Sequence, residues 1–314
     1  MHSNTLDSSQ IMRQVIYALT VGVSVSFYFF GWGVIIQIVL AVVAAIVAES
    51  AFLKMRNYPI KSTISDGSAA VTGVLLAISI PSIAPWWVIV VGVFFAIIFG
   101  KQIYGGLGNN PFNPAMLGYA FLLISYPLHM TTWASEFVSI GSSLDSILNL
   151  SSVDTFTGAT KLDEVRTQIS LGTAIETIKP YSASQAWINF GFLLGGLYLL
   201  MRKIIFWHIP VSFLSGIFLT SEVLFLMDDN AYLPPQLHLM LGATMLCAFF
   251  IATDPVSSST TPNGRLIYGF LIGVLVVIIR VFGGYPDGVA FAVLLMNIAV
   301  PLIDSYTKPR VFGK

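Results

Sequence analysis

Long apolar runs separated by short polar connections dominate the hydrophobic pattern of this chain. Several of the ten runs approach the roughly 20 residues that a helix needs to cross about 30 Å of hydrocarbon. The runs cover residues 12–30, 33–53, 67–81, 84–100, 113–128, 184–201, 205–226, 236–252, 265–282 and 287–304. They are continuous, whereas a transmembrane barrel would show alternating segments of about ten residues. We therefore predict an all-α polytopic membrane protein with about ten transmembrane helices.

One long polar connection, residues 129–183, divides the runs into five and five. It predicts three parts: a membrane half at 1–128, an outer loop at 129–183 and a second membrane half at 184–314. Because each half has an odd number of crossings, the halves would have inverted topology. Within the loop, modest apolar periodicity predicts short surface helices at Leu144, Ile147 and Leu148 and at Leu171, Ala174, Ile175 and Ile178.

The third and fifth runs are short and are interrupted by glycine, serine or proline. Short or interrupted spans in transporters mark binding sites, although tilted helices would give the same pattern. Two G-x-x-x-G pairs, Gly191/Gly195 and Gly269/Gly273, lie inside longer runs. They are more typical of close helix packing than of chemistry.

Composition agrees with a membrane protein and excludes some cofactors. Mean hydropathy is +0.83, and 10% of residues are charged, against about 25% in soluble domains. A single cysteine, Cys247, cannot form an intrachain disulfide or hold an iron–sulfur cluster. The four histidines are scattered at the ends of runs with no metal-site spacing. We expect lipid as a partner and no nucleic acid.

The distribution of basic residues predicts the orientation, because cytoplasmic connections are enriched in Lys and Arg. With the N-terminus inside and ten crossings, eleven of the fifteen basic residues fall on the cytoplasmic side. They are Arg13, Lys54, Arg56, Lys61, Lys101, Arg202, Lys203, Arg265, Lys308, Arg310 and Lys314. Lys161, Arg166, Lys179 and Arg280 fall outside. Both termini are then cytoplasmic, and residues 129–183 lie on the outer face.

A polar connection from Lys101 to Pro114 is rich in glycine and asparagine. Its glycines, Gly105, Gly106 and Gly108, permit left-handed backbone and close approach to a ligand. Its amides, Asn109, Asn110 and Asn113, supply donors and acceptors. It lacks the Gly-Lys-Ser/Thr ending of a Walker loop. Two interpretations remain: a loop that surrounds a planar ring or an ion, and a rigid turn between helices.

A second polar connection, Thr253 to Pro262, follows the eighth run and is predicted to face the same side. The hydroxyl and carboxyl groups of Thr253, Asp254 and Ser257 are candidates for binding a ring edge or a cation. In the alternative interpretation, Asp254 or Ser257 only caps a turn.

Acidic residues inside apolar runs are functional candidates, because burying a charge in hydrocarbon is unfavourable. Glu49 lies near the end of the second run, Asp66 opens the third and Glu222 lies in the seventh. We consider these three as candidates for an ion pathway, with Asp66 open to a purely interfacial role.

The outer loop contains the segment Asp154-Thr155-Phe156-Thr157-Gly158-Ala159-Thr160. It is expected to offer an exposed threonine hydroxyl, Thr160, after small residues that would let another enzyme close around it. By itself the segment predicts only a modification site.

Together with the two polar connections, this segment resembles the RnfD/NqrB family, membrane subunits of the Rnf complex and of the Na⁺-translocating NADH:quinone oxidoreductase. Its D-x-x-T-G-A-T pattern is similar to the family's flavinylation motif, with Thr157 where serine is commoner. The loop Gly105–Pro114 and the stretch Thr253–Ser257 also match, and the similarity covers nearly the whole chain. The absence of a longer N-terminal extension favours the RnfD branch.

The resemblance implies that FMN is joined by a phosphoester to Thr160, by a separate flavin transferase that recognises Asp154, Thr157, Gly158 and Ala159. It also implies a place in the inner membrane of a bacterium, with the loop periplasmic, and electron flow coupled to Na⁺ or H⁺ movement. Residues of the two polar connections are then candidates for a noncovalent riboflavin: Lys101, Gly105, Gly106, Gly108, Asn110, Asn113, Thr253, Asp254 and Ser257.

The implied partners are the other Rnf subunits, including a second FMN-carrying subunit and iron–sulfur subunits. Because this chain has no cluster cysteines and no nucleotide-binding fold, the chemistry of ferredoxin and NAD would belong to those partners. The chain would then be an electron carrier without a complete activity of its own. A secondary transporter or channel without a redox cofactor is the alternative function, and a membrane anchor for soluble redox partners is a third. The transporter or channel does not explain the segment Asp154–Thr160, and a covalently bound flavin would argue against both alternatives.

Overall fold

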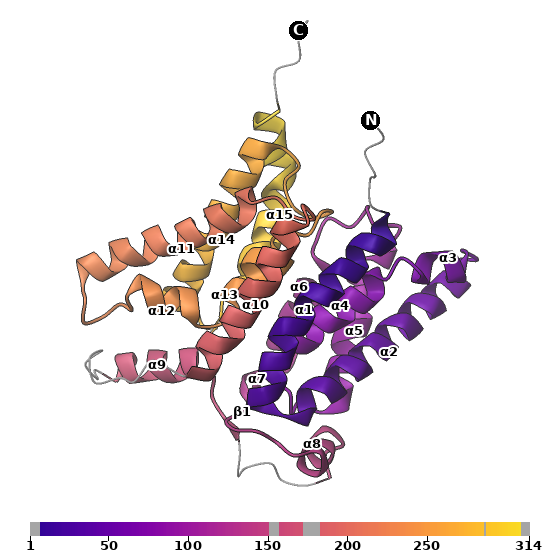
Figure 1. Ribbon diagram of the computed structural model, residues 1–314, viewed down its shortest axis with the longest axis horizontal. Helices are drawn as coiled ribbons and strands as arrows, with labels where there is room; N and C mark the ends of the chain where they lie inside the picture. The colour runs from indigo at the N-terminus through magenta and orange to yellow at the C-terminus, as the bar shows by residue number, and fades with distance from the viewer. Residues whose placement is uncertain (1–6, 151–156, 172–182, 286, 309–314) are drawn as a thin grey trace, which may run out of the picture. The chain divides into compact units, whose positions relative to one another are not determined.

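The computed structural model describes residues 7–150, 157–171, 183–285 and 287–308 (Figure 1). These residues belong to two compact units. The first is formed by Met1–Asn110, Pro114–Ala159 and Leu194–Ile204, and the second by Pro111–Asn113, Thr160–Leu193 and Ile205–Lys314.

The first unit is a helical bundle with short elements at the ends of its helices (Figure 1). In chain order it contains α1 (Ser8–Phe30), α2 (Trp32–Met55), α3 (Ile60–Ile64), α4 (Ser68–Ser79), α5 (Trp86–Gly100), the 3₁₀ turn η1 (Gln102–Tyr104), α6 (Pro114–Ser125), α7 (Pro127–Thr131), β1 (Trp133–Ala134), α8 (Ile140–Ile147) and β2 (Thr157–Gly158).

Small residues bring the helices of this bundle close together. Helix α2 packs against α4 and α5, and α5 packs against α6. Ala41, Ala45 and Ala48 of α2 are buried. A Cβ on Gly73 of α4 would lie 2.9 Å from the carbonyl oxygen of Ala41, so only glycine permits this approach, as in other membrane helix pairs.

The second unit is also helical, and in chain order it contains α9 (Lys161–Ser170), α10 (Ala183–Met201), α11 (His208–Met227), α12 (Pro235–Met240), α13 (Thr244–Leu246), the π-helical turn η2 (Cys247–Ile251), α14 (Pro262–Phe282) and α15 (Val289–Tyr306). The last part of α10, from Leu194, groups with the first unit.

Helices α11 and α14 pack closely against each other in the second unit. A Cβ on Gly269 would lie 2.2 Å from Ser212 Oγ, and one on Gly273 would lie 2.3 Å from the carbonyl oxygen of Phe213. The packing role predicted for the pair Gly269/Gly273 is confirmed.

Among the described residues, seven helices are long and apolar enough to cross a membrane: α1, α2, α5 with η1, α10, α11, α14 and α15. Helices α4 and α6, in the third and fifth runs, are shorter apolar helices of 12 residues each. The predicted continuous helix over 236–252 is wrong. That run is divided into α12, α13 and η2, because Gly242 adopts a left-handed φ of 63° between them.

The segment predicted as an outer loop contains regular structure. Strands β1 and β2 pair antiparallel, with Trp133 opposite Gly158 and Ala134 opposite Thr157, a small sheet that the all-α prediction omitted. Helix α8 confirms the surface helix predicted at Leu144. Of the second predicted helix, only Leu171 lies within the described residues, where it ends α9.

Candidate functional site

Thr160 begins helix α9 and caps it. Its Oγ1 accepts a hydrogen bond from the backbone N–H of Asp163 at 3.2 Å, the contact typical of an N-cap threonine. The side chain is partly buried, whereas the sequence predicted an exposed hydroxyl. The capping role explains the difference, because the hydroxyl turns toward its own helix.

The residues before Thr160 are accessible where they are described. Ala159 is exposed and Gly158 is partly buried in β2. A Cβ on Gly158 would meet only Ser135 Cβ, at 3.9 Å, so the space beside this residue is open. Asp154 lies outside the described residues.

Helix α9 is held by one apolar face. Leu162 and Val165 are buried in a cluster with Leu233, Leu237 and Leu241, and the partly buried Ile169 packs against it. Leu237 belongs to α12, and Leu241 lies in the interruption that follows α12. The helix that begins at Thr160 is therefore anchored to the interrupted run.

A polar contact supports the same docking. Arg166 of α9 donates from Nη2 to the carbonyl oxygen of Gly283 and from Nη1, at 3.3 Å, to that of Tyr285. Both carbonyls belong to the connection between α14 and α15. Two separate contacts thus fix the position of α9 in the second unit.

Two of the predicted ion-pathway acids are linked through Lys101 in the first unit. Glu49 is fully buried, and its Oε1 receives Lys101 Nζ at 2.5 Å and Gln102 Nε2 at 2.5 Å. Lys101 Nζ also donates to Ser68 Oγ at 2.5 Å, and Ser68 Oγ donates to Asp66 Oδ1 at 2.5 Å. A polar chain therefore runs from Asp66 to Glu49.

The second carboxylate oxygen of Glu49 differs from the first. Within the described part of the chain, Glu49 Oε2 is buried and has no hydrogen-bond partner. Lys101 was predicted as a cytoplasmic charge and a ring ligand, but its side chain is 2% exposed and bound to Glu49. The third acid, Glu222, belongs to the second unit, where it is partly buried on α11.

The glycine-rich connection adopts the backbone that its glycines predicted. Gly105, Gly106 and Gly108 have φ values of 111°, 96° and 95°, in the region that residues with a Cβ rarely occupy. Asn110 is buried, and so is Asn113 immediately before α6.

Asn297 links one residue of each polar connection, Asn113 and Ser257, within the second unit. Its Oδ1 accepts from the backbone N–H of Asn113 at 3.1 Å. Its Nδ2 donates to the carbonyl oxygen of Ser257 at 3.0 Å and to Tyr268 Oη at 2.9 Å. Asn113 Nδ2 also donates to the carbonyl oxygen of Ile251 at 3.3 Å. The sequence had indicated neither Asn297 nor Tyr268, although an asparagine inside the tenth run was the available signal.

Asp254 makes the contacts of a capped turn. Its Oδ2 accepts from Ser257 Oγ at 2.7 Å and its Oδ1 from the N–H of Val256 at 3.3 Å. Burial raises the pKa of the Asp254 carboxyl above its ordinary value, and the hydrogen bond from Ser257 opposes this shift. Thr253 Oγ1 donates to the carbonyl oxygen of Phe249 at 2.7 Å. These groups shape the turn that presents Ser257 to Asn297.

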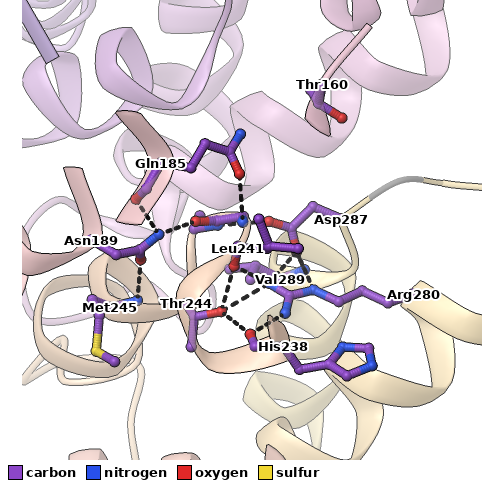
Figure 2. A network of polar contacts seen from close by, with 12 residues as sticks. Thr160, Gln185, Asn189, His238, Leu241, Thr244, Met245, Arg280, Asp287 and Val289 are labelled. Atoms are coloured by element: carbon purple, nitrogen blue, oxygen red, sulfur yellow. Dashed lines mark hydrogen bonds and ion pairs between the residues drawn. The ribbon is translucent and has the colours of Figure 1, made fainter. Parts of the chain in front are cut away.

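A network that sequence reasoning missed surrounds the interruption between α12 and α13 (Figure 2). Arg280 is 3% exposed within α14 and donates to the carbonyl oxygens of His238 and Leu241 at 2.8 and 3.4 Å. Its guanidinium also contacts Asp287 Oδ1 at 3.1 Å. In the sequence, Arg280 was assigned only as a basic residue on the outer side of the membrane. Its position inside an apolar run was itself a signal of function.

Comparisons with known proteins extend over the full length of the chain. The NQR2, RnfD, RnfE family matches residues 1–313. The chain belongs to this family. The resemblance to the RnfD/NqrB family is thereby confirmed, and it includes the interrupted run and the segment that leads into Thr160.

Proteins named as the D subunit of an ion-translocating oxidoreductase complex are similar over almost their whole length. The protein of Escherichia fergusonii is 48% identical over 336 residues, covering 99% of this chain and 96% of its own. That of Yersinia pseudotuberculosis is 49% identical over 340 residues, and that of Yersinia enterocolitica is 50% identical over 335 residues. Each of these two covers 99% of this chain and 95% of its own length.

Proposed function

We propose that this chain is the flavin-carrying membrane subunit of an Rnf-type ion-translocating oxidoreductase complex, with FMN joined to Thr160 through a phosphoester. The names of its full-length relatives support the place in such a complex. The position of Thr160 at the start of α9, after the segment Thr157-Gly158-Ala159, is the observation that carries the attachment site.

The residues around Thr160 fit a phosphate group. The N-terminus of a helix presents unpaired backbone N–H groups and a partial positive charge, which favour phosphate. Exposed Ala159 and the open space beside Gly158 leave room for a flavin and for the enzyme that attaches it. Asp163 and Glu164 in the first turn of α9 are negative charges near the same helix end, and they offset part of this attraction.

Attachment is a transfer of a flavin phosphate to a hydroxyl. A bond forms between Thr160 Oγ1 and phosphorus, the hydroxyl proton leaves, and the bond between phosphorus and the leaving group of the donor breaks. A separate flavin transferase carries out this step. The bound FMN supplies reversible electron transfer, and the protein holds it and adjusts its environment.

The same proposal places the chain in the inner membrane of a bacterium, with both termini cytoplasmic and residues 129–183 periplasmic. The ten crossings would include the short helices α4 and α6 and the interrupted run 236–252. Partner subunits, including a second FMN-carrying subunit and iron–sulfur subunits, would deliver and remove electrons.

A second flavin would be noncovalent. Asn297 joins Asn113 to Ser257 within the second unit, so these two residues are the candidates for one ring site. We assign a riboflavin to this region on that contact.

Ion coupling would use the buried acids. The hydrogen-bonded series Asp66–Ser68–Lys101–Glu49 would provide a route for a proton or a Na⁺ ion into the first unit, and Glu222 would be the candidate in the second. The second carboxylate oxygen of Glu49, Oε2, which is unpaired among the described residues, is the atom at which such a cation would be received.

The attachment site is tested on a denaturing gel. We expect flavin fluorescence on the band of the full-length chain only when a flavin transferase is coexpressed. Thr160→Ala should abolish it, and Thr160→Ser should retain it. Thr167→Ala, which removes another hydroxyl from α9, is the matched control and should remain fluorescent.

Absence of fluorescence from the unsubstituted chain, with the transferase shown to modify a known substrate, would contradict the flavin proposal. The alternative function, a transporter without a redox cofactor, would then explain the interrupted run and the buried acids better.

A further inference from the structure

The interruption between α12 and α13 is held by side chains from three other elements. Asn189 of α10 donates from Nδ2 to the carbonyl oxygens of Met240 and Gly242 at 2.8 and 3.0 Å, and its Oδ1 accepts from the N–H of Met245 at 3.0 Å. Asp287 Oδ2 accepts from the N–H of Ala243 at 2.8 Å. Peptide groups that a continuous helix would have paired are thereby satisfied, as burial in a membrane protein requires.

Arg280 completes this arrangement from α14. Besides the carbonyls of His238 and Leu241, its guanidinium reaches Thr244 Oγ1 at 3.0 Å. Figure 2 shows the Arg280 side chain reaching toward these carbonyls, with Asp287 beside it. A Cβ on Gly242 would lie 2.5 Å from Asp287 Oδ2 and 2.7 Å from Arg280 Nη2, so the ion pair is packed directly on the interruption.

Two routes lead from this ion pair to the helix that begins at Thr160. The first is apolar: Arg280 holds the carbonyl of Leu241, and the Leu241 side chain belongs to the cluster that buries Leu162 and Val165. The second is polar: the ion pair of Arg280 and Asp287 bridges the α14–α15 connection. The carbonyls of that connection, at Gly283 and Tyr285, hold Arg166 of α9.

We propose that Arg280 and Asp287 are positioning residues for the group carried on Thr160. The ion pair holds both the interruption between α12 and α13 and the α14–α15 connection. These two segments in turn hold α9 in position. Figure 2 draws no hydrogen bond between Thr160 and either Arg280 or Asp287. The ion pair would therefore act on Thr160 through α9 and not by direct contact. This proposal rests on the proposed function, because only a flavin on Thr160 would be positioned by the ion pair within the second unit.

A single spin label on α9 can test whether the ion pair of Arg280 and Asp287 controls the mobility of this helix. Its single cysteine, Cys247, is fully buried, so a nitroxide attached to Thr167→Cys, an exposed position on α9, reports the mobility of this helix. We expect an immobile spectrum from the full-length chain in lipid nanodiscs. Arg280→Lys, Asp287→Asn and Arg166→Gln should each add a mobile component. Lysine keeps the charge but cannot fork between Asp287 and the two carbonyls.

Arg265→Lys is the matched control, because it makes the same change in the same helix outside the network, and it should leave the spectrum unchanged. If Arg280→Lys and Asp287→Asn both fold and neither spectrum shows a mobile component, the proposal is overturned. A role confined to stabilising the span would lower the unfolding temperature and leave the label immobile. If Arg280→Lys gives no protein, Asp287→Asn decides, since asparagine retains an acceptor for Ala243.

The nitroxide measurement requires no flavin, so it is independent of the attachment test. With FMN on Thr160, the anisotropy of flavin fluorescence should fall in the same variants while the band on a denaturing gel stays fluorescent. Lost band fluorescence in the unsubstituted chain contradicts the proposed function alone. An unchanged spectrum together with a fluorescent band contradicts the positioning role alone.

Discussion

Lys101 is a buried cation whose partners come from distant parts of the sequence. Its amino group contacts Glu49 of α2 and Ser68 of α4, and neither charge of the pair is exposed to solvent. A buried ion pair contributes little net stability, but removing one partner leaves the other charge without compensation.

We therefore expect Lys101→Met to destabilise the protein by about 3–5 kcal/mol, because it leaves the Glu49 carboxylate buried and unpaired. The double variant Glu49→Gln/Lys101→Met should recover most of the loss. Both effects are measured by denaturant unfolding of the detergent-solubilised protein, as shifts of the unfolding midpoint. Equal losses in the single and the double variant would show that the pairing does not determine stability here.

The residue scale also shows what the sequence could predict. Glu49 and Asp66 were identifiable as acids in or beside apolar runs, but their connection was not, because Lys101 resembles an interfacial charge when only its neighbours along the chain are known. Thr160 was identifiable by its motif. Its partial burial followed from the helix that begins there. The apolar spacing of Leu162, Val165 and Ile169 was the available signal for that helix.

Among the elements, glycine positions distinguish packing from interruption. Gly269 lies in a continuous helix and permits the approach of α11, whereas Gly242 lies at a break with a left-handed backbone. A G-x-x-x-G spacing predicted the first. The second could not be predicted, because the groups that satisfy the broken backbone, Asn189, Arg280 and Asp287, come from three other parts of the chain.

Gly269→Ala should separate α11 from α14, because the new methyl group would lie 2.2 Å from Ser212 Oγ and 2.7 Å from the carbonyl oxygen of Ile209. Overpacking of this kind costs about 1–3 kcal/mol. Thermal unfolding of the purified chain measures the loss. Gly141→Ala in α8 is the control: nothing lies within 4 Å of its added methyl group, so it should be neutral or stabilising. A neutral result at Gly269 would mean that the two helices separate at little cost.

At the scale of the whole molecule, orientation is the property that the proposed function needs most. The positive-inside pattern predicts that residues 129–183 face the periplasm. Lys101 no longer supports this prediction, because it is buried and paired, but Lys54, Arg56 and Lys61 still predict a cytoplasmic α2–α4 connection.

Ala159→Cys tests the orientation directly. We expect a membrane-impermeant maleimide to label this exposed position in intact spheroplasts, and buried Cys247 to remain unlabelled. Cysteine in place of Tyr58, which is exposed in the α2–α3 connection, should react only after the membrane is opened. The reverse pattern would place the Thr160 segment in the cytoplasm and exclude a periplasmic flavin.

The ion pair of Glu49 and Lys101 has a consequence for any ion that enters the first unit. The ammonium group already neutralises the carboxylate, so the pair carries no net charge at rest. A cation arriving at Glu49 Oε2 would meet a resident competitor and add an uncompensated unit of charge in a medium of low dielectric constant. Occupancy therefore requires displacement of the lysine from the carboxylate. Lys101 would then act as a tethered counterion, and entry of a cation would be an exchange and not a simple addition.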